Sequence, residues 1–218
     1  MWCQVCKKIS DTKLCSVCEK RIREAGYGYL YKQTCPVCGN PILDRIYACS
    51  FCTDTFLAYG PYGKTLATLL RRYKIEGEIS LIPLLADIYK PLLDSFHDPL
   101  LIPIPCSREG YRKRGFDQMV CLSSYLAHRE GYVQLSLFSK RKGIPYKQLS
   151  KAARSQGEAI QLANVYSKQK RFRQLLTEGY TAILIDDVST TGITCRQAKQ
   201  LLHSQFGCEA YVIVLANS

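Results

Sequence analysis

The stretch ILIDDVSTTGIT, residues 183–194, joins an apolar run to two adjacent carboxylates and a turn rich in hydroxyl groups. Asp186 and Asp187 accept hydrogen bonds without donating any, which suits the vicinal hydroxyls of a ribose. The following turn offers hydroxyl groups, backbone N–H groups and the start of a helix, a combination that favours phosphate. Its members are Ser189, Thr190, Thr191, Gly192 and Thr194. The pattern therefore predicts a site for a ribose 5-phosphate.

Two other interpretations compete for this stretch. An apolar strand ending in aspartates is also typical of ATP-hydrolysing enzymes, and AYGPYGKT (58–65) comes close to their phosphate-binding loop. Ala58 and Pro61 both depart from a flexible glycine-rich loop, however, and such an enzyme does not need a second phosphate cradle. The plainer alternative is a pair of solvated aspartates that cap a helix.

Eight of the twelve cysteines form four Cys-x-x-Cys pairs near the start of the chain. Two such pairs supply the four thiolates that Zn²⁺ prefers, whereas a disulfide framework suits secreted chains and a thioredoxin-type site needs a single pair. The eight are Cys3, Cys6, Cys15, Cys18, Cys35, Cys38, Cys49 and Cys52. Successive pairs or alternate pairs could share an ion, so the ligand pairing stays open. We expect two structural zinc sites whose metal supplies most of the folding energy of this module.

Composition narrows the class of protein. The 218 residues are 47% hydrophobic, enough for a buried core, and no apolar run is long enough to cross a membrane. We expect a cytoplasmic protein without membrane insertion, because the N-terminus lacks the apolar core of a signal peptide. The net charge of +12 is concentrated in residues 101–173, which contain 15 basic and 4 acidic side chains. Such a block attracts polyanions, although a solvated basic face is the simpler explanation.

The rest of the chain alternates between strand and helix patterns, which predicts an α/β fold with a parallel sheet. We expect strands at 55–60, 99–105, 181–186 and 209–215, and helices at 62–74, 81–96, 116–131 and 193–207. Asp186 and Asp187 then lie at the carboxyl end of a buried strand, where open α/β sheets bind ligands. The basic stretch 139–160 shows little periodicity and is predicted to be a mobile loop.

ILIDDVSTTGIT resembles the phosphoribosyl pyrophosphate signature of type I phosphoribosyltransferases. Together with the cysteine pairs, YGPYGKTLATLLRRYKIEG, PIPCSREGYRKRGFDQ and KQLSKAAR, it makes the chain similar to the ComF family of late competence proteins. The resemblance covers almost the whole chain and implies a double zinc-ribbon module over 1–57 and a phosphoribosyltransferase-like domain over 58–218. Asp117 and Ser189 depart from the family pattern, which has asparagine and a larger residue there.

The resemblance also implies roles for individual residues. Asp186 and Asp187 would hold the ribose hydroxyls, and the hydroxyl-rich turn would hold the 5-phosphate, with Mg²⁺ bridging the sugar and its pyrophosphate. The implied pyrophosphate site consists of Arg108, Arg112, Arg114 and Gln118. The basic residues predicted to contact DNA are Lys113, Lys140, Arg141, Lys142, Lys147, Lys151 and Arg154.

Three functions are consistent with these features. The first is handling of incoming single-stranded DNA in the cytoplasm during natural transformation, which the resemblance implies and the alternation of basic and aromatic residues supports. The second is an active phosphoribosyltransferase with an unknown acceptor, although no general base stands out. The third is an adaptor gated by phosphoribosyl pyrophosphate, in which the zinc ribbon docks a competence helicase.

Overall fold

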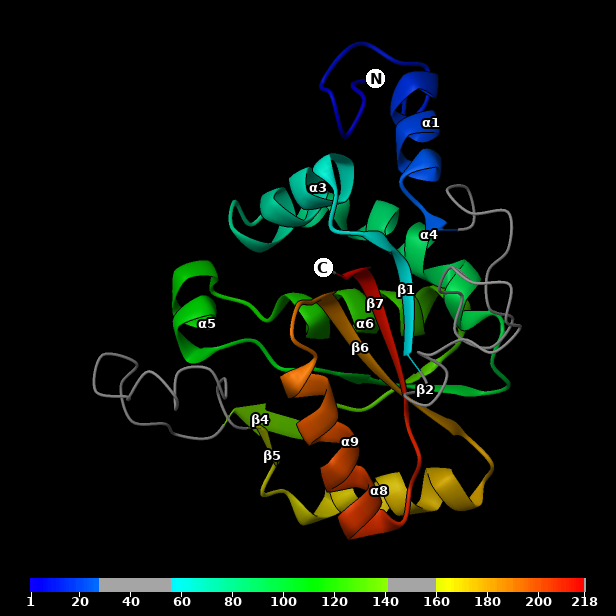
Figure 1. The fold of residues 1–218 in the computed structure, drawn as a ribbon, viewed down its shortest axis with the longest axis vertical. Helices are drawn as coiled ribbons and strands as arrows, with labels where there is room; N and C mark the ends of the chain where they lie inside the picture. Colours follow the sequence, from blue (N-terminus) through cyan, green and yellow to red (C-terminus); the bar gives the residue numbers. More distant parts are fainter. Residues whose placement is uncertain (28–55, 141–159, 218) are drawn as a thin grey trace.

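The computed structural model describes residues 1–27, 56–140 and 160–217 (Figure 1). Five parallel strands form the central sheet in the order β1-β7-β6-β2-β3. Their bounds are β1 Phe56–Pro61, β2 Pro99–Pro103, β3 Val133–Gln134, β6 Thr181–Ser189 and β7 Tyr211–Asn217. A parallel sheet buries both of its faces, so β2 is buried at every residue, as its apolar run requires. The predicted α/β fold with a parallel sheet is confirmed.

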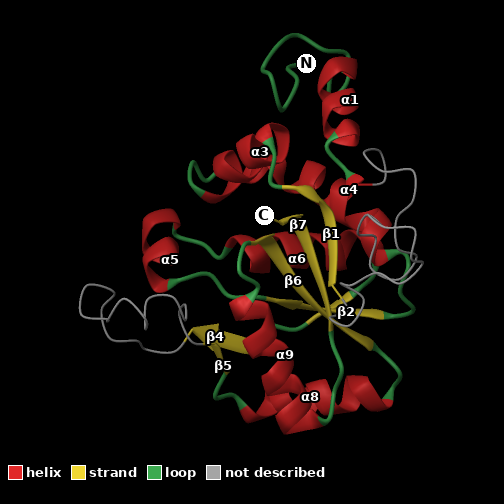
Figure 2. Cartoon of the chain, in the orientation of Figure 1, coloured by secondary structure: helices red, strands yellow, loops and turns green. Residues whose placement is uncertain are grey.

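Helices cover both faces of the sheet (Figures 1 and 2). One layer contains α3 Lys64–Lys74, the short helix η2 Ile79–Leu81, α4 Ile82–Leu93 and α6 Gln118–Glu130, which pack on Ile183 and Ile185 of β6. The other layer contains α8 Tyr166–Thr177 and α9 Ile193–Phe206, which pack on Ala182 and Leu184. Side chains of successive strand residues alternate between these two layers.

The predicted strands and helices are present, with one difference that concerns the site. The sequence predicts a strand that ends at Asp186, whereas β6 continues through both aspartates to Ser189. The extension pairs with β7, where Asp186 lies opposite Val214 and Ser189 opposite Asn217. On the other side, the pairing of β6 with β2 stops at Ile185. The aspartates thus lie beside an open edge of β6 rather than beyond its end.

Several described elements had no predicted counterpart. They are α1 Ser16–Glu24, α5 Arg108–Arg114, α8, the short strand β3, and the antiparallel pair of β4 Phe138–Lys140 and β5 Ile160–Leu162. The predicted loop at 139–160 overlaps the ends of this pair, and its interior, 141–159, lies outside the described residues. No helix in the described parts of the chain is long and apolar enough to cross a membrane.

Candidate functional site

The carboxyl ends of β2 and β6 form the point at which the chain changes direction across the sheet. β2 is followed by its neighbour β3 on one side, and β6 is followed by β7 on the other. The connections leave these two adjacent strands in opposite directions, and such divergence creates the crevice in which open α/β sheets bind ligands. The Ile104 amide still bonds the Ile185 carbonyl at 3.0 Å, so the loops that follow β2 and β6 start side by side.

The two aspartates of β6 face different helix layers. Asp187 is 2% exposed and lies on the side of α3. Asp186 is only partly buried and lies on the side of α9, where its charge adds to the effect of burial in raising the pKa of the Cys195 thiol. Burial and the charge of Asp187 raise the pKa of Asp186 to about 8. Because of this mutual repulsion, a hydrogen-bond donor or a cation that binds beside either carboxylate stabilises its ionised form.

Lys74, at the last position of α3, already pairs with one of these carboxylates. Its Nζ lies 3.0 Å from Asp187 Oδ1. Although burial opposes the charge of Lys74, the Asp187 carboxylate raises the lysine pKa above its usual value. The other oxygen, Asp187 Oδ2, is buried without a hydrogen-bond partner within the described structure. A buried orphan acceptor fits a ligand hydroxyl or a ligand-bound Mg²⁺.

The turn after β6 leads directly into α9 and keeps its backbone donors available. Gly192 occupies the residue before the helix with a left-handed φ of 67°, a conformation that side chains other than hydrogen disfavour. Among the hydrogen bonds of the described chain, none is donated by the amides of residues 190 to 194. Arg196 steadies the turn by donating to the Thr191 carbonyl at 2.6 Å. Thr190 and Thr191 are exposed, so their hydroxyl groups are free to meet an anion.

A cavity of about 420 Å³ opens beside this turn. Its polar end is formed by Ser189, Thr190, Thr191 and Gly192, and Arg196 and Lys199 of α9 add two cationic side chains. A second cavity, of about 720 Å³, lies on the α3 side of β6 and shares Thr190 with the first. Positive charge and free amides at a helix N-terminus suit the first cavity to phosphate.

The loop after β2 is fixed by Asp117. Its Oδ2 accepts from the Cys106 amide at 2.8 Å, and its Oδ1 accepts from the amides of Met119 and Val120 at the start of α6. The Asp117 carboxylate therefore caps the N-terminus of α6, a position at which aspartate is favoured, and also joins the loop after β2 to this helix. The sequence alone shows the aspartate but not this bridging role.

The four residues of the implied pyrophosphate site divide into two pairs. Arg114 donates through Nη2 to Gln118 Oε1 at 2.5 Å and through Nη1 to the Lys74 carbonyl at 3.0 Å, so this pair faces inward against α3. Arg108 and Arg112 are exposed one turn apart on α5, where they can meet an anion from solvent. Arg114 and Gln118 are thus held within the fold, whereas Arg108 and Arg112 are exposed to solvent.

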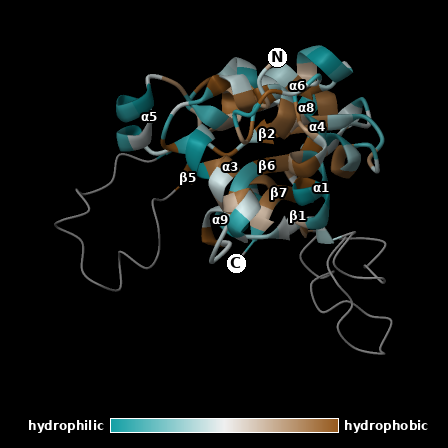
Figure 3. Ribbon diagram, turned by 90° about the horizontal axis from the view of Figure 1, so that it is seen from above, coloured by the Kyte–Doolittle hydropathy of each residue, from teal (hydrophilic) through white to brown (hydrophobic). Residues whose placement is uncertain are grey.

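Only two of the seven predicted DNA contacts lie in the described residues. Lys113 is exposed on α5 and pairs with Glu109 at 2.7 Å, and Lys140 ends β4. Arg141, Lys142, Lys147, Lys151 and Arg154 lie outside the described residues. In the hydropathy colouring, α5 stands out as a hydrophilic helix at the periphery of the molecule (Figure 3).

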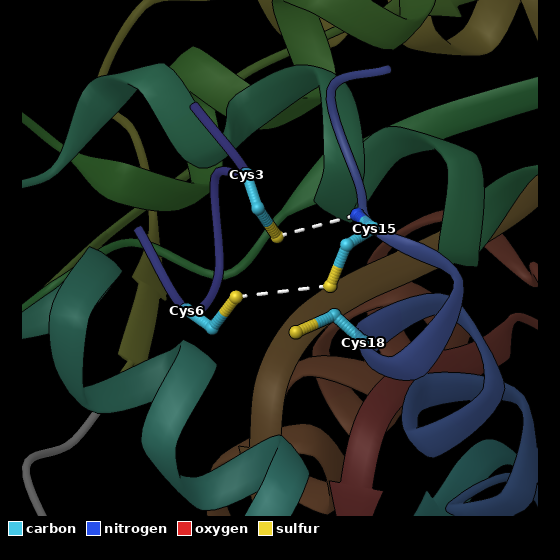
Figure 4. A group of neighbouring side chains, drawn as sticks. All are labelled: Cys3, Cys6, Cys15 and Cys18. Carbon is cyan, nitrogen blue, oxygen red and sulfur yellow. Dashed lines mark hydrogen bonds between the residues drawn. The ribbon is translucent and has the colours of Figure 1, made fainter. Parts of the chain in front are cut away.

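The first two cysteine pairs come together at the N-terminus. The Sγ atoms of Cys3, Cys6, Cys15 and Cys18 all lie within 4.8 Å of one another, from a tight turn and from the start of α1 (Figure 4). Successive pairs therefore share this centre, and Cys35, Cys38, Cys49 and Cys52 lie outside the described residues. The structure thus selects the sequential pairing for the first site.

The geometry of this centre fits a tetrahedral zinc ion. With Zn–S bonds of about 2.3 Å, neighbouring sulfurs of a tetrahedron are roughly 3.8 Å apart, and Cys6 Sγ and Cys15 Sγ are separated by 3.7 Å. The Cys15 amide donates to Cys3 Sγ at 3.4 Å. Burial opposes ionisation of Cys3, but the amides of Cys15, Cys6 and Val5 outweigh it and lower the Cys3 pKa to about 6. A sulfur stabilised as thiolate is ready to bind metal.

No family model matches the chain. It is 25% identical to the competence protein ComFC of Streptococcus pneumoniae over 88% of the chain and 82% of that protein. With ComFC of Bacillus subtilis the identity is 24%, over 88% of the chain and 78% of the relative. With the DNA utilization protein YhgH of Salmonella typhimurium it is 25%, over 92% and 88%. The chain is a homologue of ComFC and YhgH.

The two aspartates and the turn of this ComFC homologue are evident from its sequence, whereas the residues that hold them in place are not. Lys74 lies in a predicted helix, and nothing in its spacing announces a partner 113 positions later. Arg196 lies in a helix predicted from its apolar face, although its position five residues after Thr191 places it over the turn. Asp117 could have been identified as a cap, because it precedes the apolar residues of α6.

Proposed function

We propose that the chain acts in competence by handling incoming single-stranded DNA in the cytoplasm, with a site for phosphoribosyl pyrophosphate at the ends of β2 and β6. The observation that carries the sugar site is the turn 190–194, whose amides donate no hydrogen bond within the described structure and which lies beside two carboxylates. Amides and a helix N-terminus bind the phosphate, while Asp186 and Asp187 accept from the ribose hydroxyls. When bound with the ligand, Mg²⁺ supplies neutralisation of the pyrophosphate charge.

The role in competence is supported by the names of the homologous proteins. Two of them are competence proteins and the third is a DNA utilization protein. The charge of the chain points in the same direction, since residues 101–173 contain 15 basic and 4 acidic side chains. A polyanion is the ligand class that such a surface attracts.

Two binding measurements test the two parts of the proposal separately. Fluorescence anisotropy with a labelled single-stranded oligonucleotide should show binding that weakens steeply as salt rises, because bound counterions are released. Differential scanning fluorimetry should show a higher melting temperature with phosphoribosyl pyrophosphate and Mg²⁺ than with Mg²⁺ alone. Oligonucleotide binding that is absent even at low salt would refute DNA handling. A melting temperature that is the same with and without phosphoribosyl pyrophosphate would refute the sugar site.

An active phosphoribosyltransferase is the second candidate, and the cavity on the α3 side favours it. This cavity shares Thr190 with the phosphate turn and is lined by Tyr62, Lys64 and Arg71, so an anionic or aromatic acceptor has room beside the sugar. Release of pyrophosphate can be followed with a coupled assay in the presence of purines, pyrimidines and oligonucleotides. Release that depends on one acceptor class would promote this function, and none above background would reject it.

A further inference from the structure

Three consecutive residues at the end of α3 connect the cysteine centre to both loops of the proposed sugar site. Arg72 contacts the cysteine turn, Tyr73 donates its hydroxyl to the Gln118 carbonyl at 2.5 Å, and Lys74 pairs with Asp187. We call Arg72, Tyr73 and Lys74 the α3 junction. In Figure 1, α3 lies between the N-terminal segment and the sheet, in agreement with these contacts.

The Arg72 side chain is buried where it contacts the cysteine turn. Its side chain is 9% exposed and donates to the carbonyls of Gln4 and Val5, each at 2.7 Å. These carbonyls belong to the two residues between Cys3 and Cys6. Glu78 completes the arrangement, because it accepts from Arg72 Nε at 2.7 Å and also pairs with Lys7. A buried guanidinium whose three nitrogens all donate hydrogen bonds fixes both segments that it joins.

On the opposite side, the junction reaches both strands of the crevice. The Lys74 side chain bonds Asp187 at the edge of β6, and the Lys74 carbonyl accepts from Arg114 Nη1 at 3.0 Å, next to the loop after β2. Because one residue meets both loops, a shift of the last turn of α3 moves an acid of the ribose site and an arginine beside the loop after β2 together.

We propose, on the basis of the proposed sugar site, that Arg72 is a positioning residue for that site and that metal binding at Cys3, Cys6, Cys15 and Cys18 is coupled through the α3 junction to binding of phosphoribosyl pyrophosphate. A metal that holds Cys3 and Cys6 together fixes the carbonyls between them, and these hold Arg72. The cysteine module then acts as the support on which Asp187 and Arg114 are set. Thermodynamic linkage requires the reverse effect as well, so the sugar pyrophosphate retains the metal.

The test compares the zinc-loaded full chain with Arg72→Met and Cys18→Ser, and with Arg23→Met as matched control. Arg23 is exposed on α1, in the same module, and offers the same change in charge and length. Arg72→Met keeps all four cysteines, which separates the junction from loss of the metal itself. We expect Arg72→Met to weaken phosphoribosyl pyrophosphate binding about tenfold by calorimetry, within the range of measured couplings, and Arg23→Met to leave it unchanged.

Hydrogen–deuterium exchange provides a readout that needs no ligand. Relative to wild type, Cys18→Ser and Arg72→Met should both speed exchange at residues 72–78, 114–118 and 185–188, whereas Arg23→Met should not.

In the wild type, saturating phosphoribosyl pyrophosphate with Mg²⁺ should slow the zinc-release phase that Cys18→Ser lacks, and Arg72→Met should abolish this slowing. If faster exchange stays within residues 1–27, the coupling is refuted. If exchange spreads but wild type binds no sugar pyrophosphate, the structural connection through the α3 junction stands, whereas the proposed sugar site, and with it the coupling to that ligand, is refuted.

Discussion

Lys74 Nζ lies 3.0 Å from Asp187 Oδ1, so an ion pair joins the end of α3 to the edge of the central strand. The carboxylate is 3% exposed and the lysine 42% exposed, so solvent reaches one partner only. The pair leaves Asp187 Oδ2 without a hydrogen bond in the described structure. A carboxylate that is held in place by one oxygen can accept a hydrogen bond from a ligand hydroxyl with its other oxygen.

Asp187→Asn tests this arrangement. Asparagine keeps the shape of the side chain but loses the negative charge that attracts Lys74. It also replaces one of the two carboxylate oxygens that accept hydrogen bonds from a diol. We expect loss of the thermal stabilisation by phosphoribosyl pyrophosphate and Mg²⁺, with an intrinsic destabilisation of about 1 kcal/mol or less because Lys74 is partly solvated. Asp94→Asn, which removes an exposed pair with Lys90, is the control. A mutant that the ligand stabilises as strongly as wild type would place the ribose elsewhere.

Asp186 gives the protein a pH dependence of defined sign. Burial and the charge of Asp187 raise its pKa to about 8 in the folded state, well above the value of an unfolded aspartate near 4. The unfolded chain therefore loses this proton first, and the carboxyl group contributes stability below pH 4 that is lost as the pH rises to 8. Asp186→Asn should remove this loss.

Thermal melts across pH 4–9 measure the effect. At pH 8 the Asp186→Asn variant should melt higher than wild type, by roughly 2–4 °C for each kcal/mol recovered. At pH 4 the two melting temperatures should converge. A constant difference across the range would show that Asp186 ionises normally.

Gly192 permits the turn that presents the donors of the proposed phosphate site. Its φ of 67° makes alanine costly by about 1–2 kcal/mol, and Gly207, with a φ of 63°, occupies the matching position at the other end of α9. Gly192→Ala and Gly207→Ala should destabilise the protein by similar amounts in urea titrations. Only Gly192→Ala should weaken phosphoribosyl pyrophosphate binding. Equal ligand affinity in the two variants would count against the turn as a phosphate site.

The exposed cations of α5 are expected to bind the DNA backbone. Arg112→Ala combined with Lys113→Ala should weaken binding of single-stranded oligonucleotides and lower the slope of log affinity against log salt by about 0.7 for each phosphate that is no longer neutralised. Lys170→Ala with Arg171→Ala, on exposed positions of α8, removes the same charge from another surface. If both double variants lose affinity equally, the effect is one of net charge and α5 has no special role.

Metal analysis tests the cysteine centre. Elemental analysis of the purified chain should give two zinc ions per chain, one in the described centre and one at the later cysteines. Cys18→Ser should lower the count by one, because three thiols hold zinc less tightly than four. Cys195→Ser alters a buried thiol of α9 and should keep both ions. A count of one in the wild type would contradict the second site.

The sequence predicted the parts of this protein that depend on local patterns. Apolar runs indicated the strands and leucine spacing indicated the helices, and the hydroxyl-rich turn indicated the candidate phosphate site, since each signal lies within a dozen residues. α5 was missed because its seven residues are mostly charged and none is buried, so it has no apolar periodicity. α8 was missed because it is largely polar and buries only Phe172 and Leu175.

The supports of the site could not be predicted because they join distant segments. Arg72 meets Gln4 and Val5 across more than sixty positions, and Lys74 meets Asp187 across 113. A charged residue on a helix shows no sign of such a partner in a single sequence. The length of β6 was misjudged for a similar reason, since its last residues are held in the sheet by β7 and not by their own apolar character.

Within the described parts of the chain, the edge strand β1 pairs with β7 alone, and Tyr27 bonds Asn217 nearby. During synthesis β1 emerges before β7 and cannot pair with it until residues 211–217 leave the ribosome, roughly 7–30 s later at about 5–20 residues per second. Until then the nascent chain exposes a strand edge whose hydrogen bonds to β7 have not formed. A chain that stops before β7 keeps this edge exposed, and an exposed strand edge is prone to pair with other chains.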